Sequence, residues 1–274
     1  MRHVQGIHLM NIRCRTILLI AFSCLALGGC AQFSLKSAWR DHEIVIDGKD
    51  TEWQDRMVKQ GNVAFGASND GQFLYLCLAV TDKKSKAQLM GLFRQSFCVW
   101  FDPEGKRKKA LGVRFTNESP MMDESLVRKI KQITTPTFQL IANEMMSNLI
   151  IEVERREYPV ALLSDAPGID VAAAISMNGR KLVYEMKVPL GRSEAHPFAI
   201  GALQGKPVSI GVEATPIDWG FLYAEQAKIM YGSGGGGQGR RSMSASGGQD
   251  AYMLPDEIHR VSVWGKIQLA AQVK

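Results

Sequence analysis

Apolar positions along this chain fall into short blocks separated by turn-forming Gly, Asp, Asn and Pro, a pattern typical of β-strands. Residues 72–80 are apolar at nearly every position, which predicts a strand buried on both faces. Residues 95–101 repeat this character and run into Asp102-Pro103-Glu104-Gly105, a composition that suits a tight turn. The expected strands are residues 43–46, 62–67, 72–80, 95–101, 109–116, 148–154, 168–176, 181–188, 207–214 and 261–269.

Two segments follow a helical period instead. Residues 86–93 and 122–133 place apolar side chains three and four positions apart, which predicts short amphipathic helices inserted between strands. Asn178-Gly179 is a strong hairpin signal between two expected strands. Many short strands, few helices and Gly-centred turns predict an all-β fold, a single antiparallel β-sandwich. Residues 232–249, rich in Gly and Ser, are expected to form a flexible loop.

The N-terminal segment has the pattern of a secretory signal. Arg13 and Arg15 precede an apolar run at residues 16–27, which is too short for a transmembrane helix. The run ends in Leu27-Gly28-Gly29-Cys30, which resembles the lipobox at which bacterial lipoprotein precursors are cut and lipidated. The resemblance implies that the mature protein begins at Cys30 and is anchored to a membrane by acyl chains. An ordinary cleaved signal peptide with a chance cysteine is the alternative.

These observations predict the organisation of the chain. We expect residues 1–29 to be a lipoprotein signal peptide, 30–41 a tether from lipidated Cys30, and 42–274 the β-sandwich domain. The resemblance implies a location in the cell envelope, and Ala31 after the cysteine indicates sorting to the outer membrane.

Charge and cysteine content narrow the possible partners. The precursor has 33 basic and 27 acidic side chains, and three arginines but no acids precede Cys30. The mature chain is therefore only mildly basic, which argues against a nucleic-acid partner.

Cys77 and Cys98 remain after lipidation of Cys30, and both lie in apolar strand-like runs. Two buried free thiols or a disulfide are both compatible with this pattern.

Five short motifs follow one another along the chain. They are IVIDG at residues 44–48 with Trp53 after it, NDGQFLYL at 69–76, VWFDPEGK at 99–106, YEMKVPL at 184–190 and VWGKIQL at 263–269. In this order they resemble the elements of family 9 carbohydrate-binding modules and their DOMON-like relatives. The resemblance implies one β-sandwich and a binding module rather than an enzyme. The motif residues themselves have structural explanations, such as the turn at Asp47-Gly48.

Exposed aromatic side chains near polar groups are the usual contacts for sugar rings. An aromatic cluster before the Gly-rich segment supplies the candidate ligand-binding residues, with core packing as the alternative explanation. The cluster is Trp219, Phe221, Tyr223 and Tyr231.

Metal and haem sites are weaker possibilities. Asp47, Asp50 and Glu52 could hold calcium, which family 9 modules can carry, although their spacing matches no known loop. DOMON-like relatives can hold haem through Met and His or Lys. The mature chain's candidates for such ligands include His42, His196, His259, Met177, Met186, Met230 and Met253. Methionine at such positions is more often core filler.

The sequence contains no pattern of catalytic residues. Its carboxylates lie in turns or on strand faces, and no serine occurs in a nucleophile-elbow motif. The sequence therefore favours a lipid-anchored, non-catalytic envelope protein that binds carbohydrate. The alternatives are a structural lipoprotein that contacts another envelope protein, or a haem domain for electron transfer.

Overall fold

A computed structural model of the chain describes residues 33–91, 95–116, 135–161, 163–176, 180–203, 205–216 and 260–272. The chain forms two compact units, residues 1–33 and 34–274, and the described residues beyond Phe33 all belong to the second unit. Among the described residues, no helix has the length and hydrophobicity needed to span a bilayer.

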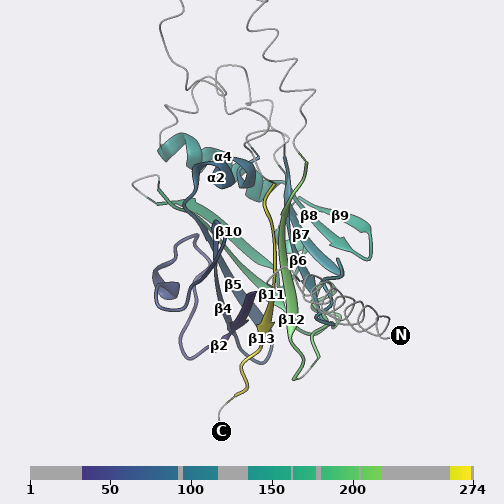
Figure 1. The fold of residues 1–274 in the computed structure, drawn as a ribbon. Helices are drawn as coiled ribbons and strands as arrows, with labels where there is room; N and C mark the ends of the chain where they lie inside the picture. The colour runs from purple at the N-terminus through teal and green to yellow at the C-terminus, as the bar shows by residue number, and fades with distance from the viewer. Residues whose placement is uncertain are drawn as a thin grey trace, which may run out of the picture. The chain divides into compact units, whose positions relative to one another are not determined.

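The second unit is built from two β-sheets (Figure 1). The larger has seven strands in the order β1 (Phe33–Lys36), β13 (Ser262–Gln268), β12 (Val208–Ala214), β6 (Phe97–Asp102), β7 (Leu111–Phe115), β8 (Leu149–Val153) and β9 (Arg156–Val160). The smaller has six, in the order β10 (Asp170–Ile175), β11 (Leu182–Pro189), β5 (Phe73–Val80), β4 (Val63–Asn69) and β2 (Ala38–Trp39), with β3 (Val58–Gln60) also paired to β4. All strand pairs formed among β4 to β13 are antiparallel, whereas β2 pairs with β4 in parallel. The predicted all-β sandwich is confirmed.

The core lies between the two sheets. Tyr184 of β11 contacts Phe97 and Phe115 of the seven-stranded sheet, with ring centroids 4.8 and 5.4 Å apart. All three side chains are fully buried, and the Tyr184 hydroxyl donates a hydrogen bond to the backbone oxygen of Leu89 at 2.7 Å. Because side chains alternate along a strand, Cys98 and Trp100 in β6 face away from this core. That outer face carries the site described below.

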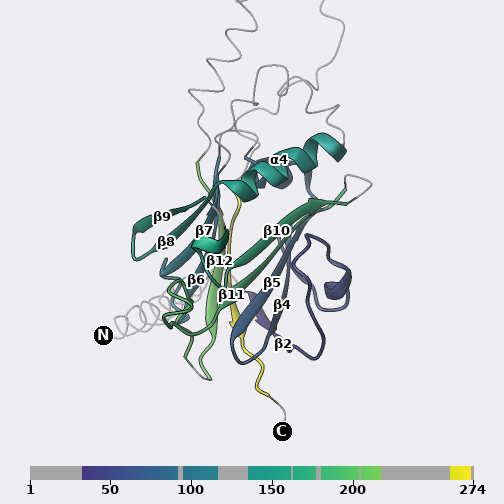
Figure 2. The same cartoon turned by 180° about the vertical axis from the view of Figure 1, so that it is seen from behind.

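Two helices lie at one end of the sandwich, α2 (Lys83–Leu89) and α4 (Thr135–Ser147), and Figure 2 shows α4 from behind. Helix α2 overlaps the helix predicted at 86–93 but begins earlier, because the Asp82 side chain accepts a hydrogen bond from Ser85 N and caps it. The helix predicted at 122–133 lies outside the described residues. Helix α4 was not predicted, and its Gln139 bonds the edge strand β10 at Ala173 O and Ile175 N.

The segment before β3 covers the outer face of the six-stranded sheet. Ile44 and Trp53, the latter in a short 3-10 helix (Thr51–Trp53), pack there on Tyr75, Cys77 and Val183. The strand predicted at 43–46 is wrong, since these residues form no regular structure. Their apolar alternation reflects packing onto a sheet rather than pairing within it.

The first strands begin earlier in the chain than the sequence predicts. Strands β1 and β2 lie within residues 30–41, the range assigned to a tether. A short 3-10 helix (Leu163–Asp165) precedes β10. Cys77 and Cys98 are buried free thiols on the outer faces of different sheets, so the sandwich itself separates them.

Candidate functional site

Glu185 on β11 forms a buried junction with two of the sequence motifs. Its side chain has no exposed surface, and the Trp53 indole donates to one carboxylate oxygen at 2.6 Å. The backbone N–H groups of Asp47 and Gly48 donate to the other oxygen at 3.0 and 2.8 Å. Burial raises the pKa of Glu185, and these donors offset part of the increase. The IVIDG turn, Trp53 and Glu185 are therefore one structural unit that holds the covering segment on the sheet.

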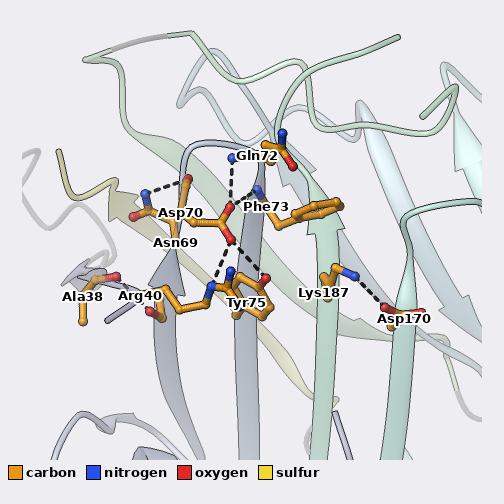
Figure 3. Close-up of polar contacts among 10 residues, drawn as sticks. Ala38, Arg40, Asn69, Asp70, Gln72, Phe73, Tyr75, Asp170 and Lys187 are labelled. Atoms are coloured by element: carbon orange, nitrogen blue, oxygen red, sulfur yellow. Dashed lines mark hydrogen bonds and ion pairs between the residues drawn. The ribbon is translucent and has the colours of Figure 1, made fainter. Parts of the chain in front are cut away.

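Asp70 plays a similar role in the turn between β4 and β5 (Figure 3). One of its oxygens accepts the backbone N–H groups of Gln72 and Phe73 at 2.8 and 2.7 Å. The other accepts the Tyr75 hydroxyl at 3.1 Å and pairs with Arg40 Nε at 3.0 Å. Burial, followed by the nearby Asp70 charge, raises the pKa of Tyr75 to about 12. The NDG motif thus shapes a hairpin.

Asp102 closes the turn after β6 in the same way. Its carboxylate is fully buried and accepts the backbone N–H groups of Glu104, Lys106 and Lys108 at 2.9, 2.6 and 2.9 Å. The motif carboxylates Glu185, Asp70 and Asp102 therefore satisfy backbone or indole N–H donors. Their oxygens are thus occupied within the protein.

Two tryptophans lie in one row across the outer face of the seven-stranded sheet. Trp100 of β6 is paired in register with Gly112 of β7 and Gly211 of β12, and Gly211 is paired with Trp264 of β13. A Cβ atom on Gly112 would lie 2.7 Å from the Trp100 ring, and one on Gly211 would overlap the Trp264 ring. Each indole therefore lies over a glycine, flat against the sheet. We call Trp100 and Trp264 together the tryptophan platform.

Glu213 joins the platform to its basic neighbours. Its carboxylate accepts the Trp264 indole N–H at 2.8 Å and pairs with Lys109 at 2.5 Å. The Lys109 ammonium also lies 5.1 Å from the centre of the Trp100 ring, within cation–π range. Burial alone would raise the pKa of Glu213, but the hydrogen bonds from Lys109 and Trp264 outweigh it and lower the pKa. Glu213 is thus a fixed, ionised acceptor beside the indoles.

Arg114, in the neighbouring strand β7, supplies a further positive charge near Trp100. Its guanidinium pairs with Glu152 at 3.2 Å and Glu157 at 2.7 Å, while its buried Nε atom has no hydrogen-bond partner. Burial raises the pKa of Glu152 despite the opposing charge of Arg114. An unpartnered buried donor of this kind is uncommon in proteins.

Trp100 lines a cavity of about 790 Å3 together with Lys109, Arg114, Glu152 and Glu213, and we call this the platform cavity. This volume lies within the range of small-molecule sites. Its lining combines one aromatic ring with five basic side chains and three carboxylates. The lining also includes Cys98, and burial raises the pKa of this thiol well above its usual value. A protonated, buried thiol is a poor nucleophile, so the cavity offers stacking and charged hydrogen bonds rather than thiol chemistry.

The residues singled out from sequence fall elsewhere. Trp219, Phe221, Tyr223 and Tyr231 lie outside the described residues, as do Cys30 and the Gly-rich segment 232–249. Sequence reasoning missed Trp100 and Trp264 as ligand candidates. An isolated glycine within an apolar strand is the available signal, because it marks close approach of another group.

Two of the three candidate calcium ligands already have cationic partners, and the third, Glu52, accepts a hydrogen bond from the Thr51 hydroxyl. Asp47 pairs with Lys49, and Asp50 pairs with Lys181 at 2.5 Å. Across the described part of the chain, no group of three or more His, Cys, Asp or Glu side chains is placed to hold a metal ion.

The candidate haem ligands are spread over the chain. His42 bonds Asp41 at 2.6 Å, His196 packs edge-on to Phe73, and Met186 is buried in β11. The others, His259, Met177, Met230 and Met253, lie outside the described residues.

No protein-family model matches the sequence, and no curated protein matches it. Among solved structures, a family 9 carbohydrate-binding module from Caldicellulosiruptor kristjanssonii in complex with glucose is 10% identical with a TM-score of 0.38, covering 88% of this chain and 97% of that one. Its cellotriose complex is 11% identical with a TM-score of 0.39, covering 88% and 95%. A Bacteroides uniformis protein assigned as carbohydrate-binding is 11% identical with a TM-score of 0.34, covering 67% and 84%. The chain is similar to these proteins in fold, and the likeness places no sugar on it.

Proposed function

We propose that this protein is a non-catalytic carbohydrate-binding protein and that the tryptophan platform is its binding surface. The observation that carries the proposal is the pair of indoles laid over Gly112 and Gly211 beside a cavity rimmed by charged groups. A pyranose ring has apolar C–H faces that stack on aromatic rings, and hydroxyls that bond to charged groups. The half-buried Trp264 indole and the small exposed part of Trp100 supply the first kind of contact, and Glu213, Lys109 and Arg114 supply the second.

The charge pairing at the rim supports binding rather than hydrolysis. Glu213 is held ionised by Lys109 and Trp264, and Glu152 is paired with Arg114. Glycosidases use one carboxyl as a proton donor and another, at a set distance, as base or nucleophile. Carboxylates fixed in ion pairs are suited to accept hydrogen bonds from sugar hydroxyls.

Replacing Trp100 with alanine is expected to weaken glycan binding by about 10- to 100-fold, since a lost aromatic contact of this size is worth about 1.5–3 kcal/mol. The measurement is isothermal titration calorimetry against the glycans that the wild-type protein retains from a broad panel of oligosaccharides and polysaccharides. Tyr158→Ala removes an exposed aromatic side chain that does not line the platform cavity, and is the matched control.

Trp100 is only 7% exposed, so its loss also removes packing. Lys109→Ala is a smaller change at the same site, because Lys109 is exposed and loses only its ion pair with Glu213 and its contact with Trp100. Its unfolding midpoint should fall less than that of Trp100→Ala. Unchanged affinity in both variants, or no binding to any glycan in the panel, would contradict the proposal.

We also propose that Cys30 is lipidated and anchors the protein in the cell envelope, at the outer membrane. The support is the sequence of residues 13–30, with its basic start, short apolar run and LGGC ending. Cys30→Ser is expected to move the protein from the detergent phase to the aqueous phase on Triton X-114 partitioning. The intact mass of the wild-type protein should exceed that of the polypeptide beginning at Cys30 by the mass of the attached acyl chains. Recovery of an unlipidated wild-type chain cleaved elsewhere would rule the anchor out.

A further inference from the structure

The turn between β8 and β9 is strained. Val153 pairs with Arg156, so only Glu154 and Arg155 connect the two strands. Both have positive φ angles, 51° and 70°. A two-residue hairpin turn with two positive φ angles is the type that strongly prefers Asn-Gly. Residues other than glycine are strained in this conformation, because Cβ comes too close to the backbone carbonyl oxygen. The sequence therefore places two long charged residues where glycine or asparagine would be more stable.

Both strained residues line the platform cavity. Arg155 is exposed, and in the part of the chain that the structure describes it makes no hydrogen bond or ion pair with the protein. It shares the cavity lining with Arg114, whose Nε atom is buried without a partner. Basic side chains in the lining outnumber carboxylates by five to three. The unpaired Arg155 guanidinium thus shares with the Trp100 ring a cavity that has excess positive charge.

We propose that the strained turn holds Arg155 at the platform cavity so that it binds the carboxylate of an acidic glycan, one that contains uronic acid residues. This inference rests on the proposed carbohydrate function and specifies its ligand class. The planar guanidinium fork matches a carboxylate with two parallel hydrogen bonds. Strain that persists at a surface turn is explained when the strained residue has a binding role.

The test compares acidic polysaccharides with their carboxyl-reduced forms, which keep the sugar backbone and lose the charge. Polygalacturonate, alginate and hyaluronan serve as the acidic set, and neutral glucans and xylans complete the panel. The wild-type protein is expected to bind at least one native acidic polysaccharide about 10-fold more tightly than its reduced form. This preference should diminish as salt is raised, because surface charges are screened.

Arg155→Gly separates the role of the arginine from that of the fold. It is expected to abolish the preference for the acidic form and to raise the unfolding midpoint by about 2–4 °C, because glycine adopts the positive φ angle without strain. Arg107→Gly is the matched control, because Arg107 is also exposed and has a φ of 62° but does not line the platform cavity. It should raise the midpoint similarly and leave the preference intact. Arg155→Lys keeps the charge and should retain part of the preference.

Each outcome decides between the two proposals. Equal binding of native and reduced polysaccharides, or binding of neutral glycans alone, overturns the acidic-glycan inference while carbohydrate binding stands. A preference that survives in Arg155→Gly overturns the role of Arg155. The absence of binding to any polysaccharide in the panel removes the proposed function itself, and this inference with it.

Discussion

Replacing Glu185 with glutamine is expected to lower the free energy of unfolding by about 2–4 kcal/mol, the cost of leaving buried charge-assisted hydrogen bonds unmade. One carboxylate oxygen accepts the Trp53 indole N–H, and the other accepts the N–H groups of Asp47 and Gly48. A glutamine has a single acceptor oxygen. In either orientation its NH2 group faces a buried donor, so at least one N–H loses its partner. Denaturant unfolding followed by tryptophan fluorescence measures the loss.

A double-mutant cycle with Trp53→Phe makes this prediction specific. Phenylalanine has no indole N–H, so the amide of Glu185→Gln can turn its NH2 group toward the vacated position and its oxygen toward the turn. The double variant should therefore lose less stability than the two single changes added together. Glu194→Gln, at an exposed position, is the control and should have little effect. Strictly additive losses would show that Glu185 and Trp53 do not act as one unit.

The second large effect is expected for Gly48→Ala, which should lower the free energy of unfolding by more than about 3 kcal/mol. Gly48 has a φ of +78°, and a Cβ atom there would lie 2.7 Å from Ala174 N and 2.8 Å from Ala173 C. These are backbone atoms of β10, and they cannot rotate away as the end of a side chain could. The turn would have to leave the sheet and release the Glu185 hydrogen bonds.

Gly61→Ala is the matched control for this substitution. Gly61 has a φ of +60°, but a Cβ atom on it would meet no heavy atom within 4 Å, so only backbone strain of about 1 kcal/mol is expected. Thermal unfolding of the two variants gives the difference, which isolates the steric contact with β10. Similar losses of stability in both variants would mean that the turn and β10 can move apart at little cost in free energy.

Local pattern was sufficient to predict most of the fold. The apolar blocks at 72–80 and 95–101 correspond to β5 and β6. Each of these strands has one face in the core and the other face covered by other parts of the protein, so its residues are apolar on both sides. The same reasoning failed at 43–46. There Ile44 packs onto an existing sheet, and hydrophobic alternation cannot distinguish packing on a sheet from pairing within one.

The site could not be predicted in the same way because it depends on register between distant strands. Trp264 lies over Gly211 only because β12 and β13 pair in one alignment, and no local pattern near either residue specifies that alignment. Glu185 shows the same limit, since its partners Asp47, Gly48 and Trp53 lie far away in the chain. A carboxylate at an alternating strand position is normally expected to face water, so its burial at a structural junction was not foreseeable from its neighbours.

The hydrogen bonds from Gln139 to β10 have a consequence for the behaviour of this protein at high concentration. An open sheet edge can recruit the strand of another molecule, which is the first step of many aggregation reactions. Gln139 occupies Ala173 O and Ile175 N on one such edge. On the other sheet, the outermost strand β9 carries Arg156, Glu157 and a proline, which resist the same addition. Molecules crowded together should therefore remain separate at these two edges.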